Sequence, residues 1–310
     1  MSDRKIIAVA GPTASGKTEY AIKIALENNG EIVSCDSMQL YKYMDIGSAK
    51  PTSEELSMVK HWLVDEIDPL EEFSVSRYRD LAKNAINDIF GRGKTPVIAG
   101  GTGLYLNSLL YDMDFSDASK DAELRKTLMD EAELYGPEFV HRKLEEIDPV
   151  KASKIHPNNV KKVIRALEGA VSGKGIAEFS DLKERTSEYD ALLIGITRDR
   201  EELYDRINRR VDIMVDQGIF QEVKGLLDMG LDEDDISMKG IGYKEVISYY
   251  HGDLTMDEAI DKIKQNTRHL AKRQLTWFRR YEDMNWVNIS ELGEEGAMKK
   301  IRELINGCGI

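Results

Sequence analysis

The segment from Gly11 to Thr18 restricts the fold of this chain more than any other part of the sequence. It reads Gly-Pro-Thr-Ala-Ser-Gly-Lys-Thr and matches the pattern G-x-x-x-x-G-K-[ST] at every fixed position. A short apolar run at residues 5–10 precedes it and is typical of a buried parallel strand, and a helical pattern follows from Thr18. This order of strand, loop and helix predicts a site for a diphosphate or triphosphate at the start of the helix.

The residue types of this loop suit phosphate binding. Glycine lets backbone N–H groups turn towards phosphate oxygens, and the following helix adds free N–H groups and the positive end of its dipole. Lys17 supplies a positive charge for the terminal phosphates, and Thr18 supplies a hydroxyl suited to a magnesium ion. The predicted phosphate-binding residues are therefore Gly11, Pro12, Thr13, Ala14, Ser15, Gly16, Lys17 and Thr18.

Strand and helix patterns alternate along most of the chain. Further apolar runs, typical of strands, occupy residues 31–36, 95–99 and 191–197. Further helical patterns occupy residues 74–90, capped by Ser74 or Ser76, and residues 199–217 and 256–280. This alternation predicts an α/β fold of the P-loop NTPase-like kind, with a mainly parallel sheet flanked by helices.

A charged, strand-poor stretch interrupts this pattern from about Phe115. It contains Pro137, Pro149 and Pro157 as breaks and otherwise favours helix. We therefore predict an all-helical insertion between two parts of the P-loop core, with boundaries at 1–115, 116–188 and 189–310.

Composition and charge exclude several classes of protein. Only Cys35 and Cys308 are present, too few for a disulfide framework or a four-cysteine zinc site. No stretch approaches about 18 consecutive apolar residues, and the first residues do not resemble a signal peptide. The net charge of −13 argues against a protein that coats nucleic acid through its overall field. We therefore expect a cytoplasmic protein that does not bind a membrane. Because nothing in the sequence indicates a protein partner, we expect a monomer.

Two further motifs follow predicted strands and should face the phosphate loop, because ligands bind beyond the carboxyl ends of strands in open α/β sheets. Asp36 ends the second strand, in the run Asp-Ser-Met-Gln, and its carboxylate could hold magnesium or act as a general base. A turn in which Asp36 only caps the next segment is the alternative. Thr102, in Gly-Gly-Thr-Gly after the third strand, offers a hydroxyl, and a flexible turn is its alternative.

One strongly basic segment stands out in this acidic chain. Residues 262–280 carry seven Lys and Arg and no Asp or Glu, and Trp277 and Phe278 lie among the charges. Such a segment can contact phosphates and stack unpaired bases, although an amphipathic helix with a solvated basic face would look the same. Two smaller clusters, Lys161–Arg165 and Lys239–Lys244, share this ambiguity. With its two glycines, Lys239–Lys244 is expected to be flexible enough to follow an RNA backbone.

These motifs together resemble the tRNA dimethylallyltransferase family. The resemblance includes the phosphate loop, the run from Asp36 to Pro51 and Gly100-Gly-Thr-Gly-Leu-Tyr105. It continues through Arg165-Ala-Leu-Glu168, Tyr204-Asp-Arg-Ile-Asn-Arg-Arg210, Gly240-Ile-Gly-Tyr-Lys244 and the segment from Arg268 to Phe278. It extends to about Trp286, and the acidic stretch beyond carries no recognisable motif. Because two cysteines cannot form the zinc finger of many eukaryotic members, the bacterial type is expected.

The resemblance implies a reaction and its partners. The family transfers a dimethylallyl group from dimethylallyl diphosphate to the exocyclic N6 amine of the adenosine 3′ of the tRNA anticodon, and diphosphate is released. The expected partners are therefore dimethylallyl diphosphate, Mg²⁺ held by Thr18, and a tRNA anticodon stem-loop gripped by the helical insertion.

The same resemblance implies roles for individual residues. Asp36 is expected to accept a proton from the adenine amine or to orient it, and Lys17 and Arg210 to stabilise the leaving diphosphate. Arg210 ranks above Arg206, which lies one helical turn earlier, and above Arg209. The residues expected to contact tRNA are Asp36, Ser37, Met38, Gln39, Thr102, Lys161, Lys162, Val163, Ile164, Arg165, Lys239, Gly240, Ile241, Gly242, Tyr243, Lys244, Arg268, Lys272, Arg273 and Trp277.

Three other functions stay open at this stage. A small-molecule kinase would use the phosphate loop, a magnesium threonine and Asp36 in the same way, but it would have no need of the basic segment around Trp277. An adenylate isopentenyltransferase would transfer the same isoprenoid to free nucleotides without the RNA-facing segments. A nucleotide-dependent RNA-binding switch would show nucleotide turnover or exchange rather than prenyl transfer.

Overall fold

The computed structural model describes residues 4–113, 122–171 and 185–310. The chain divides into two compact units, one formed by Met1–Leu110 with Thr186–Ile310 and the other by Tyr111–Arg185. The expected boundary at 115/116 falls outside the described residues. Within the described ranges, none of the helices combines the length and apolar character that crossing a membrane requires.

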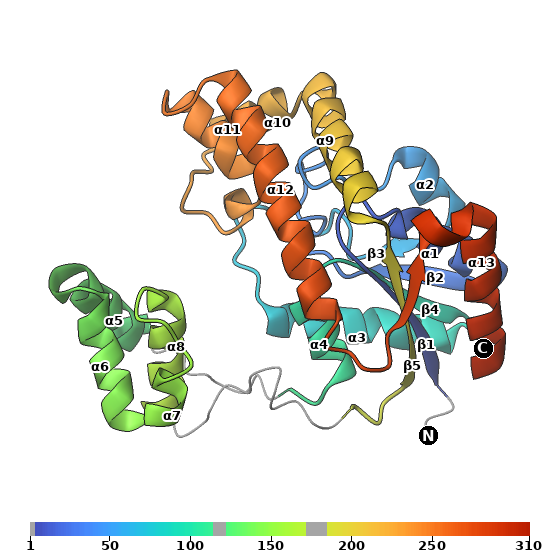
Figure 1. Ribbon diagram of the computed structural model, residues 1–310, viewed down its shortest axis with the longest axis horizontal. Helices are drawn as coiled ribbons and strands as arrows, with labels where there is room; N and C mark the ends of the chain where they lie inside the picture. The colour runs from blue at the N-terminus through green and yellow to red at the C-terminus, as the bar shows by residue number, and fades with distance from the viewer. Residues whose placement is uncertain (1–3, 114–121, 172–184) are drawn as a thin grey trace. The chain divides into compact units, whose positions relative to one another are not determined.

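The first unit is built on one six-stranded parallel sheet (Figure 1). Every strand pair in it is parallel, and the spatial order is β3-β2-β4-β1-β5-β6. The strands are β1 (Lys5–Ala10), β2 (Gly30–Ser34), β3 (His61–Trp62), β4 (Thr95–Gly100), β5 (Asp190–Thr197) and β6 (Asn285–Asn288). The predicted parallel α/β class is confirmed, whereas β3 and β6 were not predicted, because strands of two and four residues are too short to show a pattern.

The helices of this unit begin where local chemistry predicts helix starts. Ser74 accepts a hydrogen bond from the backbone N–H of Arg77, which confirms it as the cap of α3, and Thr255 forms a capping box with Glu258 at the start of α12. The helices are α1 (Lys17–Glu27), α2 (Ser53–Met58), α3 (Val75–Gly91), α4 (Gly103–Leu110), α9 (Arg200–Gln217), α10 (Ile219–Asp228), α11 (Tyr243–Tyr250), α12 (Met256–Phe278) and α13 (Ile289–Cys308).

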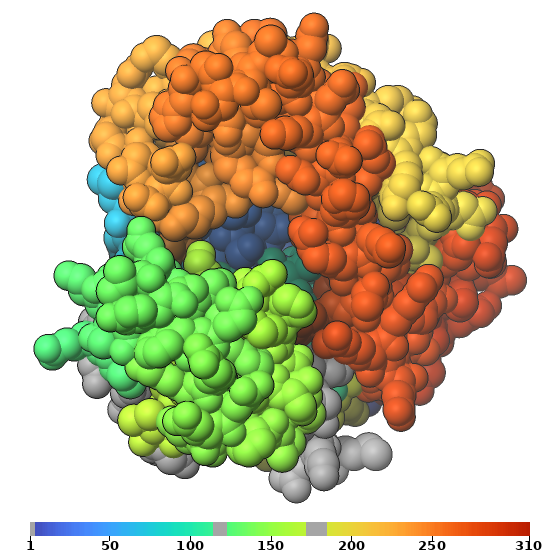
Figure 2. Space-filling model, turned by 60° about the vertical axis from the view of Figure 1, so that its left-hand side comes forward, coloured from blue at the N-terminus to red at the C-terminus, as the bar shows by residue number. Residues whose placement is uncertain are grey.

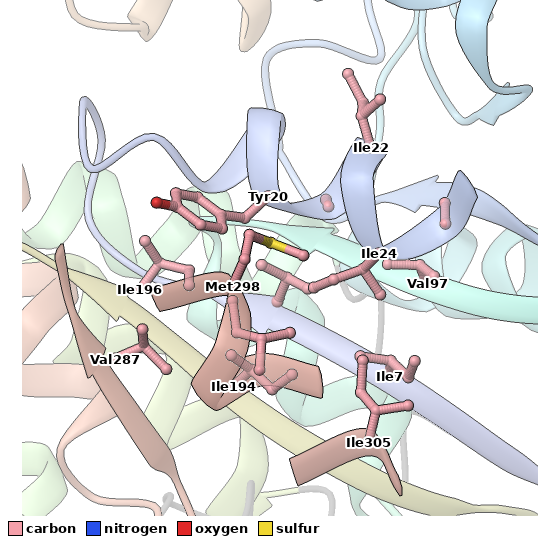
Figure 3. Packing of buried hydrophobic residues seen from close by; sticks show 14 of the residues in the cluster. Ile7, Tyr20, Ile22, Ile24, Val97, Ile194, Ile196, Val287, Met298 and Ile305 are labelled. Carbon is pink, nitrogen blue, oxygen red and sulfur yellow. The ribbon is translucent and has the colours of Figure 1, made fainter. Parts of the chain in front are cut away.

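Helices α1 and α13 bury one face of the sheet. Figure 3 shows Ile24 of α1 and Met298 and Ile305 of α13 over Ile7 and Ile194 of the central strands. The acidic C-terminal stretch therefore contains a core helix: its apolar side chains recur at helical spacing, with the charges on the opposite side. Sequence analysis assigned no motif to this stretch.

Helices α3 and α4 pack together away from that cluster. The rings of Tyr78 and Tyr105 stack with their centroids 3.9 Å apart, and the Tyr78 hydroxyl donates a hydrogen bond of 3.0 Å to the carbonyl of Ser34. Since alternate strand residues point to opposite faces, we infer that these helices cover the second face of the sheet. This packing sets the position of the C-terminal ends of β2 and β4.

Substitution of Gly100 by alanine is expected to destabilise the first unit by about 3 kcal/mol, because overpacking a filled site costs about this much. A Cβ atom at Gly100 would lie 2.0 Å from the carbonyl oxygen of Cys35, a backbone atom that cannot move aside easily. The measurement is the urea midpoint of unfolding. Gly91→Ala is the matched control, since its Cβ would meet nothing within 4 Å. Equal midpoints for the two variants would contradict the prediction.

The second unit is a small helical bundle with its own core. It contains α5 (Ala122–Tyr135), α6 (Pro137–Ile147), α7 (Pro149–Ala152) and α8 (Val160–Val171), packed around a cluster of buried apolar side chains. The carboxylate of Glu168 is 1% exposed and accepts two hydrogen bonds from Arg125, at 2.8 and 2.9 Å. This paired charge fixes α8 against α5, because a buried carboxylate needs a partner.

Candidate active site

The loop from Gly11 to Thr18 lies between β1 and α1. Gly16 caps α1 with a φ of 98°, in the left-handed region that glycine adopts most easily, and Ala14 has a φ of 63°. The hydroxyl of Ser15 is fully buried and has no hydrogen-bond partner among the described residues. A buried hydroxyl of this kind is a ready donor for a bound anion.

Lys17 lies at the start of α1 with its ammonium group directed back to the loop. Its Nζ atom is 3.4 Å from the carbonyl oxygen of Pro12. The pKa of Lys17 is lowered to about 8: burial is the largest cause, the carboxylate of Asp36 acts in the opposite direction, and Arg210 adds to the lowering. The charged form is therefore costly in this structure, and a bound anion would stabilise it.

Three arginines contact consecutive residues of the loop from the far part of the chain. Arg210 Nη1 is 3.3 Å from Thr13 Oγ1, and Arg206 Nε donates to the carbonyl of Ala14 at 2.9 Å. Arg198 Nε donates to the carbonyl of Ser15 at 3.0 Å. Burial lowers the pKa of Arg210 and of Arg206, as expected for guanidinium groups held partly out of water. Sequence analysis had singled out Arg210 and Arg206 but not Arg198.

Asp36 follows β2 and is held by its own turn. Its Oδ1 atom accepts hydrogen bonds from the backbone N–H groups of Met38, at 2.9 Å, and Gln39, at 3.4 Å. Its Oδ2 atom makes no hydrogen bond to the described residues. The turn and the candidate chemical role are therefore compatible, since one oxygen fixes the carboxylate and the other remains for a ligand.

A pocket joins Asp36 to the phosphate loop. It combines charged and hydroxyl side chains with an apolar wall, and its lining residues are Lys17, Thr18, Ala21, Ile32, Ser34, Asp36, Gln39, Pro51, His61, Ala99 and Gly100. The Nδ1 atom of His61 lies 2.8 Å from the carbonyl of Val59, and burial lowers the pKa of this imidazole. Sequence analysis did not select His61, because a lone histidine gives no local signal.

The residues after Asp36 are tied to the neighbouring strand end. The backbone N–H of Ser37 donates to Thr102 Oγ1 at 3.1 Å, so the two predicted strand-end motifs meet. The side-chain amide of Gln39 is bonded to Ser34 Oγ and to the carbonyl of Ala49, both at 3.1 Å. Gln39 therefore holds the loop that follows β2, and its side chain is less available to a base than predicted.

The cluster Lys239–Lys244 is more ordered than the flexible segment we expected. Residues Ser237–Lys239 form a 3-10 turn, and α11 begins at Tyr243. Tyr243 is fully buried, and its hydroxyl donates to Glu222 at 2.9 Å. This corrects the prediction of an RNA contact for the side chain of Tyr243, and Gly242 is buried beside it. Lys239 and Lys244 remain exposed.

Glu222 explains why Tyr243 is held in this position. Its carboxylate also accepts hydrogen bonds from the backbone N–H groups of Asp45, Ile46 and Gly47, at 2.8, 2.7 and 3.0 Å. One side chain of α10 therefore fixes the loop after β2 and the start of α11 together. Glu222, which is half-buried, was not predicted, because its local sequence does not distinguish it from other glutamates.

The cluster Lys161–Arg165 divides between two sides of α8. Lys161, Lys162 and Arg165 are exposed, but Val163 and Ile164 are 0% and 2% exposed and belong to the core of the second unit. The prediction that the side chains of Val163 and Ile164 contact tRNA is therefore wrong, because these side chains pack against their own helices.

Helix α12 carries the largest basic segment. It lies at the surface of the first unit, with α11 and α9 as neighbours (Figure 2). Lys272 and Arg273 are exposed, and Arg268 Nη1 donates to Asn208 Oδ1 on α9 at 2.7 Å. Trp277 is half-buried and packs beside Gly103, at the start of α4. The basic segment is thus an amphipathic helix whose charges reach solvent on one side.

This geometry defines the class of the protein: a P-loop-like α/β protein whose pocket brings Lys17 and Thr18 of the loop together with the carboxylate of Asp36. A model of the IPP transferase family matches residues 39–281. The tRNA dimethylallyltransferase of Acetivibrio thermocellus is 50% identical over 308 residues, which cover 98% of this chain and 98% of that protein. The tRNA dimethylallyltransferase of Clostridioides difficile is 49% identical over 286 residues, which cover 92% of each.

Solved structures agree with these relatives. The tRNA isopentenylpyrophosphate transferase of Bacillus halodurans has a TM-score of 0.74 and 42% identity, with 99% of this chain and 96% of that chain covered. A eukaryotic dimethylallyltransferase, described as acting on tRNA, has a TM-score of 0.82 and 29% identity, with 96% of this chain and 78% of that chain covered. The chain belongs to the IPP transferase family, and the resemblance inferred from its motifs is confirmed.

Proposed function

We propose that this protein transfers the dimethylallyl group of dimethylallyl diphosphate to the exocyclic N6 amine of the adenosine 3′ of the tRNA anticodon. The observation that carries the proposal is the pocket in which Lys17 and Thr18 of the phosphate loop meet the carboxylate of Asp36. Membership of a family whose relatives are named tRNA dimethylallyltransferases supports the same reaction.

The residues of the pocket suit each part of this transfer. The amine nitrogen forms a bond to the first carbon of the dimethylallyl group, and the bond from that carbon to the diphosphate oxygen breaks. Diphosphate leaves with the electron pair, and the amine proton passes to the carboxylate of Asp36, held through its Oδ1 atom by the turn. Lys17, Arg210 and the loop N–H groups stabilise the charge on the departing diphosphate.

Magnesium fits the donors of this pocket. Thr18 and Asp36 both present oxygen atoms, which magnesium prefers, and both line the pocket. Among the described residues, no group of three or more His, Cys, Asp or Glu side chains is placed to hold a metal ion. The residues therefore suit an ion bound largely by the diphosphate and water, as magnesium often is. Bound there, it would neutralise part of the diphosphate charge.

The exposed basic side chains are our candidates for the RNA surface. On α12 these are Lys272 and Arg273, and the half-buried Arg268 lies on the same helix. On other elements the exposed cations are Lys161, Lys162, Arg165, Lys239 and Lys244. Ser37, Met38 and Thr102 lie next to Asp36 and suit contact with the target base, which must leave its stack to be modified. Binding that depends on contacts between cationic side chains and phosphates weakens as the salt concentration rises. The affinity for RNA should therefore fall with ionic strength.

The test is a transfer assay with labelled dimethylallyl diphosphate, magnesium and an unmodified tRNA anticodon stem-loop, run beside AMP as acceptor and beside ATP turnover. Label in the stem-loop but not in AMP is the expected result. Label in AMP alone would indicate an adenylate isopentenyltransferase. Turnover of ATP without any prenyl transfer would overturn the proposal in favour of a kinase.

The affinity for diphosphate is expected to fall as pH rises through about 8. Burial holds the pKa of Lys17 near this value in the free protein, so Lys17 is charged below it and neutral above it. A bound anion favours the charged form, and the loss should approach about tenfold per pH unit above the pKa. The measurement is calorimetric titration with inorganic diphosphate at pH 7, 8 and 9.

The matched control is Lys17→Arg, which stays charged over this range. The ionisation of diphosphate itself affects both proteins equally, so the comparison isolates Lys17. Parallel pH profiles for the two proteins would contradict the prediction. A proton uptake on binding that is larger in the native protein than in Lys17→Arg would support it.

A further inference from the structure

Gln274 of α12 reaches the phosphate loop from the other end of the chain. Its Oε1 atom accepts a hydrogen bond of 2.8 Å from the backbone N–H of Thr13. Its Nε2 atom donates a hydrogen bond of 3.0 Å to the carbonyl of Gly101. One side chain thus bridges the loop after β1 and the loop after β4, using both ends of its amide group.

The bridge is tightly packed. A Cβ atom at Gly101 would lie 2.4 Å from Nε2 of Gln274, so the Gln274 side chain approaches this backbone more closely than any residue but glycine allows. One turn later on α12, Trp277 occupies the space beside Gly103, where a Cβ would lie 2.2 Å from its indole ring. This side of α12 therefore fixes the backbone that follows β4, including Thr102, which accepts from the N–H of Ser37 beside Asp36.

The contact with Thr13 concerns the diphosphate directly. Thr13 is the loop residue whose hydroxyl lies 3.3 Å from Arg210, and its N–H belongs to the backbone that would surround the phosphates. An acceptor on this N–H sets the orientation of the peptide group between Pro12 and Thr13. Gln274 therefore determines which way a loop peptide points, although it does not belong to the loop.

The opposite side of the same turn faces solvent. Lys272 and Arg273 precede Gln274 immediately and are exposed. In a helix, neighbouring residues point in different directions, whereas residues three or four apart share a face. Gln274 and Trp277, three apart, point to the phosphate loop and the end of β4, while the cations point outward. One short stretch of α12 thus contacts the phosphate loop through Gln274 and presents Lys272 and Arg273 to solvent.

We propose that Gln274 is a positioning residue for the transfer reaction: it sets the phosphate loop and the end of β4 so that diphosphate and Asp36 are correctly placed. This proposal rests on the proposed prenyl transfer. It assigns Gln274, within the basic segment, to the diphosphate rather than to RNA. Loss of Gln274 should therefore affect the diphosphate substrate and leave RNA affinity unchanged.

The test variant is Gln274→Met, which keeps the length of the side chain and removes both hydrogen bonds. The matched control is Gln265→Met, at an exposed position of the same helix. We expect KM for dimethylallyl diphosphate to rise about tenfold in Gln274→Met, the range set by one or two lost hydrogen bonds. KM for the stem-loop should stay within about twofold of the native value, and Gln265→Met should change neither.

Two results would overturn the proposal: an unchanged KM for the diphosphate, or an equal rise in KM for RNA, which would show that Gln274 reads the RNA. If Gln274→Met does not fold, Gln274→Glu serves instead, because it keeps an acceptor for Thr13 N–H and loses the donor to Gly101. Its diphosphate KM should also rise, and a native value would equally overturn the proposal.

Direct binding of inorganic diphosphate separates this inference from the proposed function. If the native protein transfers no prenyl group, the function fails, but the dissociation constant for inorganic diphosphate can still be compared. Weaker binding to Gln274→Met than to Gln265→Met supports the positioning role in that case. Equal binding removes it.

Discussion

Asp36→Asn is expected to lower the rate of prenyl transfer about 10²- to 10⁴-fold, the range typical of lost general-base catalysis. Asparagine keeps an oxygen at the position that accepts from the N–H groups of Met38 and Gln39, so the turn after β2 should persist. What is lost is the charge and the basicity of the second oxygen. The measurement is the single-turnover rate with saturating dimethylallyl diphosphate and stem-loop RNA.

Diphosphate binding distinguishes a chemical defect from a folding defect in this variant. Removal of the negative charge near the loop should leave the affinity for inorganic diphosphate equal or slightly higher. The titration is best made at pH 6, about two units below the native Lys17 pKa of about 8, because the loss of the Asp36 charge lowers the pKa of Lys17. Asp228→Asn, at an exposed position on α10 paired with Lys224, is the control. A transfer rate of Asp36→Asn within tenfold of the native rate would show that Asp36 is not the general base.

Local sequence was sufficient to predict the parts of the site that are contiguous in the chain. The strand before Gly11, the glycine at position 16 and the helix after it are fixed by neighbours within a few residues. The turn at Asp36 is equally local, because an aspartate that bonds the N–H groups two and three residues later needs nothing distant. The strand, the loop and the helix were predicted, and the turn at Asp36 was the alternative left open, which the structure shows.

Charge patterns were a weaker guide, because a helix separates adjacent residues onto different faces. In Lys161–Arg165, the basic side chains are exposed while Val163 and Ile164 enter the core of the second unit. In Lys239–Lys244, the glycines indicated flexibility, but Tyr243 is anchored by Glu222 and starts a helix. The structure shows which side chains of each cluster are exposed and which are buried, and RNA contact by the exposed ones stays a prediction.

Two supports of the phosphate loop, Arg198 and Gln274, were not predicted, because they come from far along the chain. Arg206 and Arg210 are equally distant and were named only through the family resemblance. Arg198 is 183 residues from Ser15, and Gln274 is 261 residues from Thr13. A polar residue that acts through such a contact leaves no pattern around itself. Glu222 is another example, since it binds three N–H groups of a loop more than 170 residues earlier. Sequence motifs identified the loop, and the tertiary fold determines what holds it.

Arg210→Gln is expected to lower the transfer rate about 10²- to 10³-fold, as seen when one donor to a developing anion is removed. Arg210 is half-buried and contacts Thr13 of the loop, so solvent screens its charge less than that of an exposed arginine. Arg210→Lys should recover only part of the rate, because an ammonium group cannot offer two parallel donors to phosphate oxygens. The measurement is again the single-turnover rate.

The neighbouring arginines provide a stringent control for this prediction. Arg209 is adjacent in sequence, but its side chain is 64% exposed and pairs with Asp205 at 2.6 Å, so Arg209→Gln should leave the rate nearly native. Arg206 bonds the backbone of Ala14 rather than a side chain of the loop, so the rate of Arg206→Gln should fall between the two. Equal rates for Arg209→Gln and Arg210→Gln would show that net positive charge on α9, and not the position of one guanidinium, determines the rate.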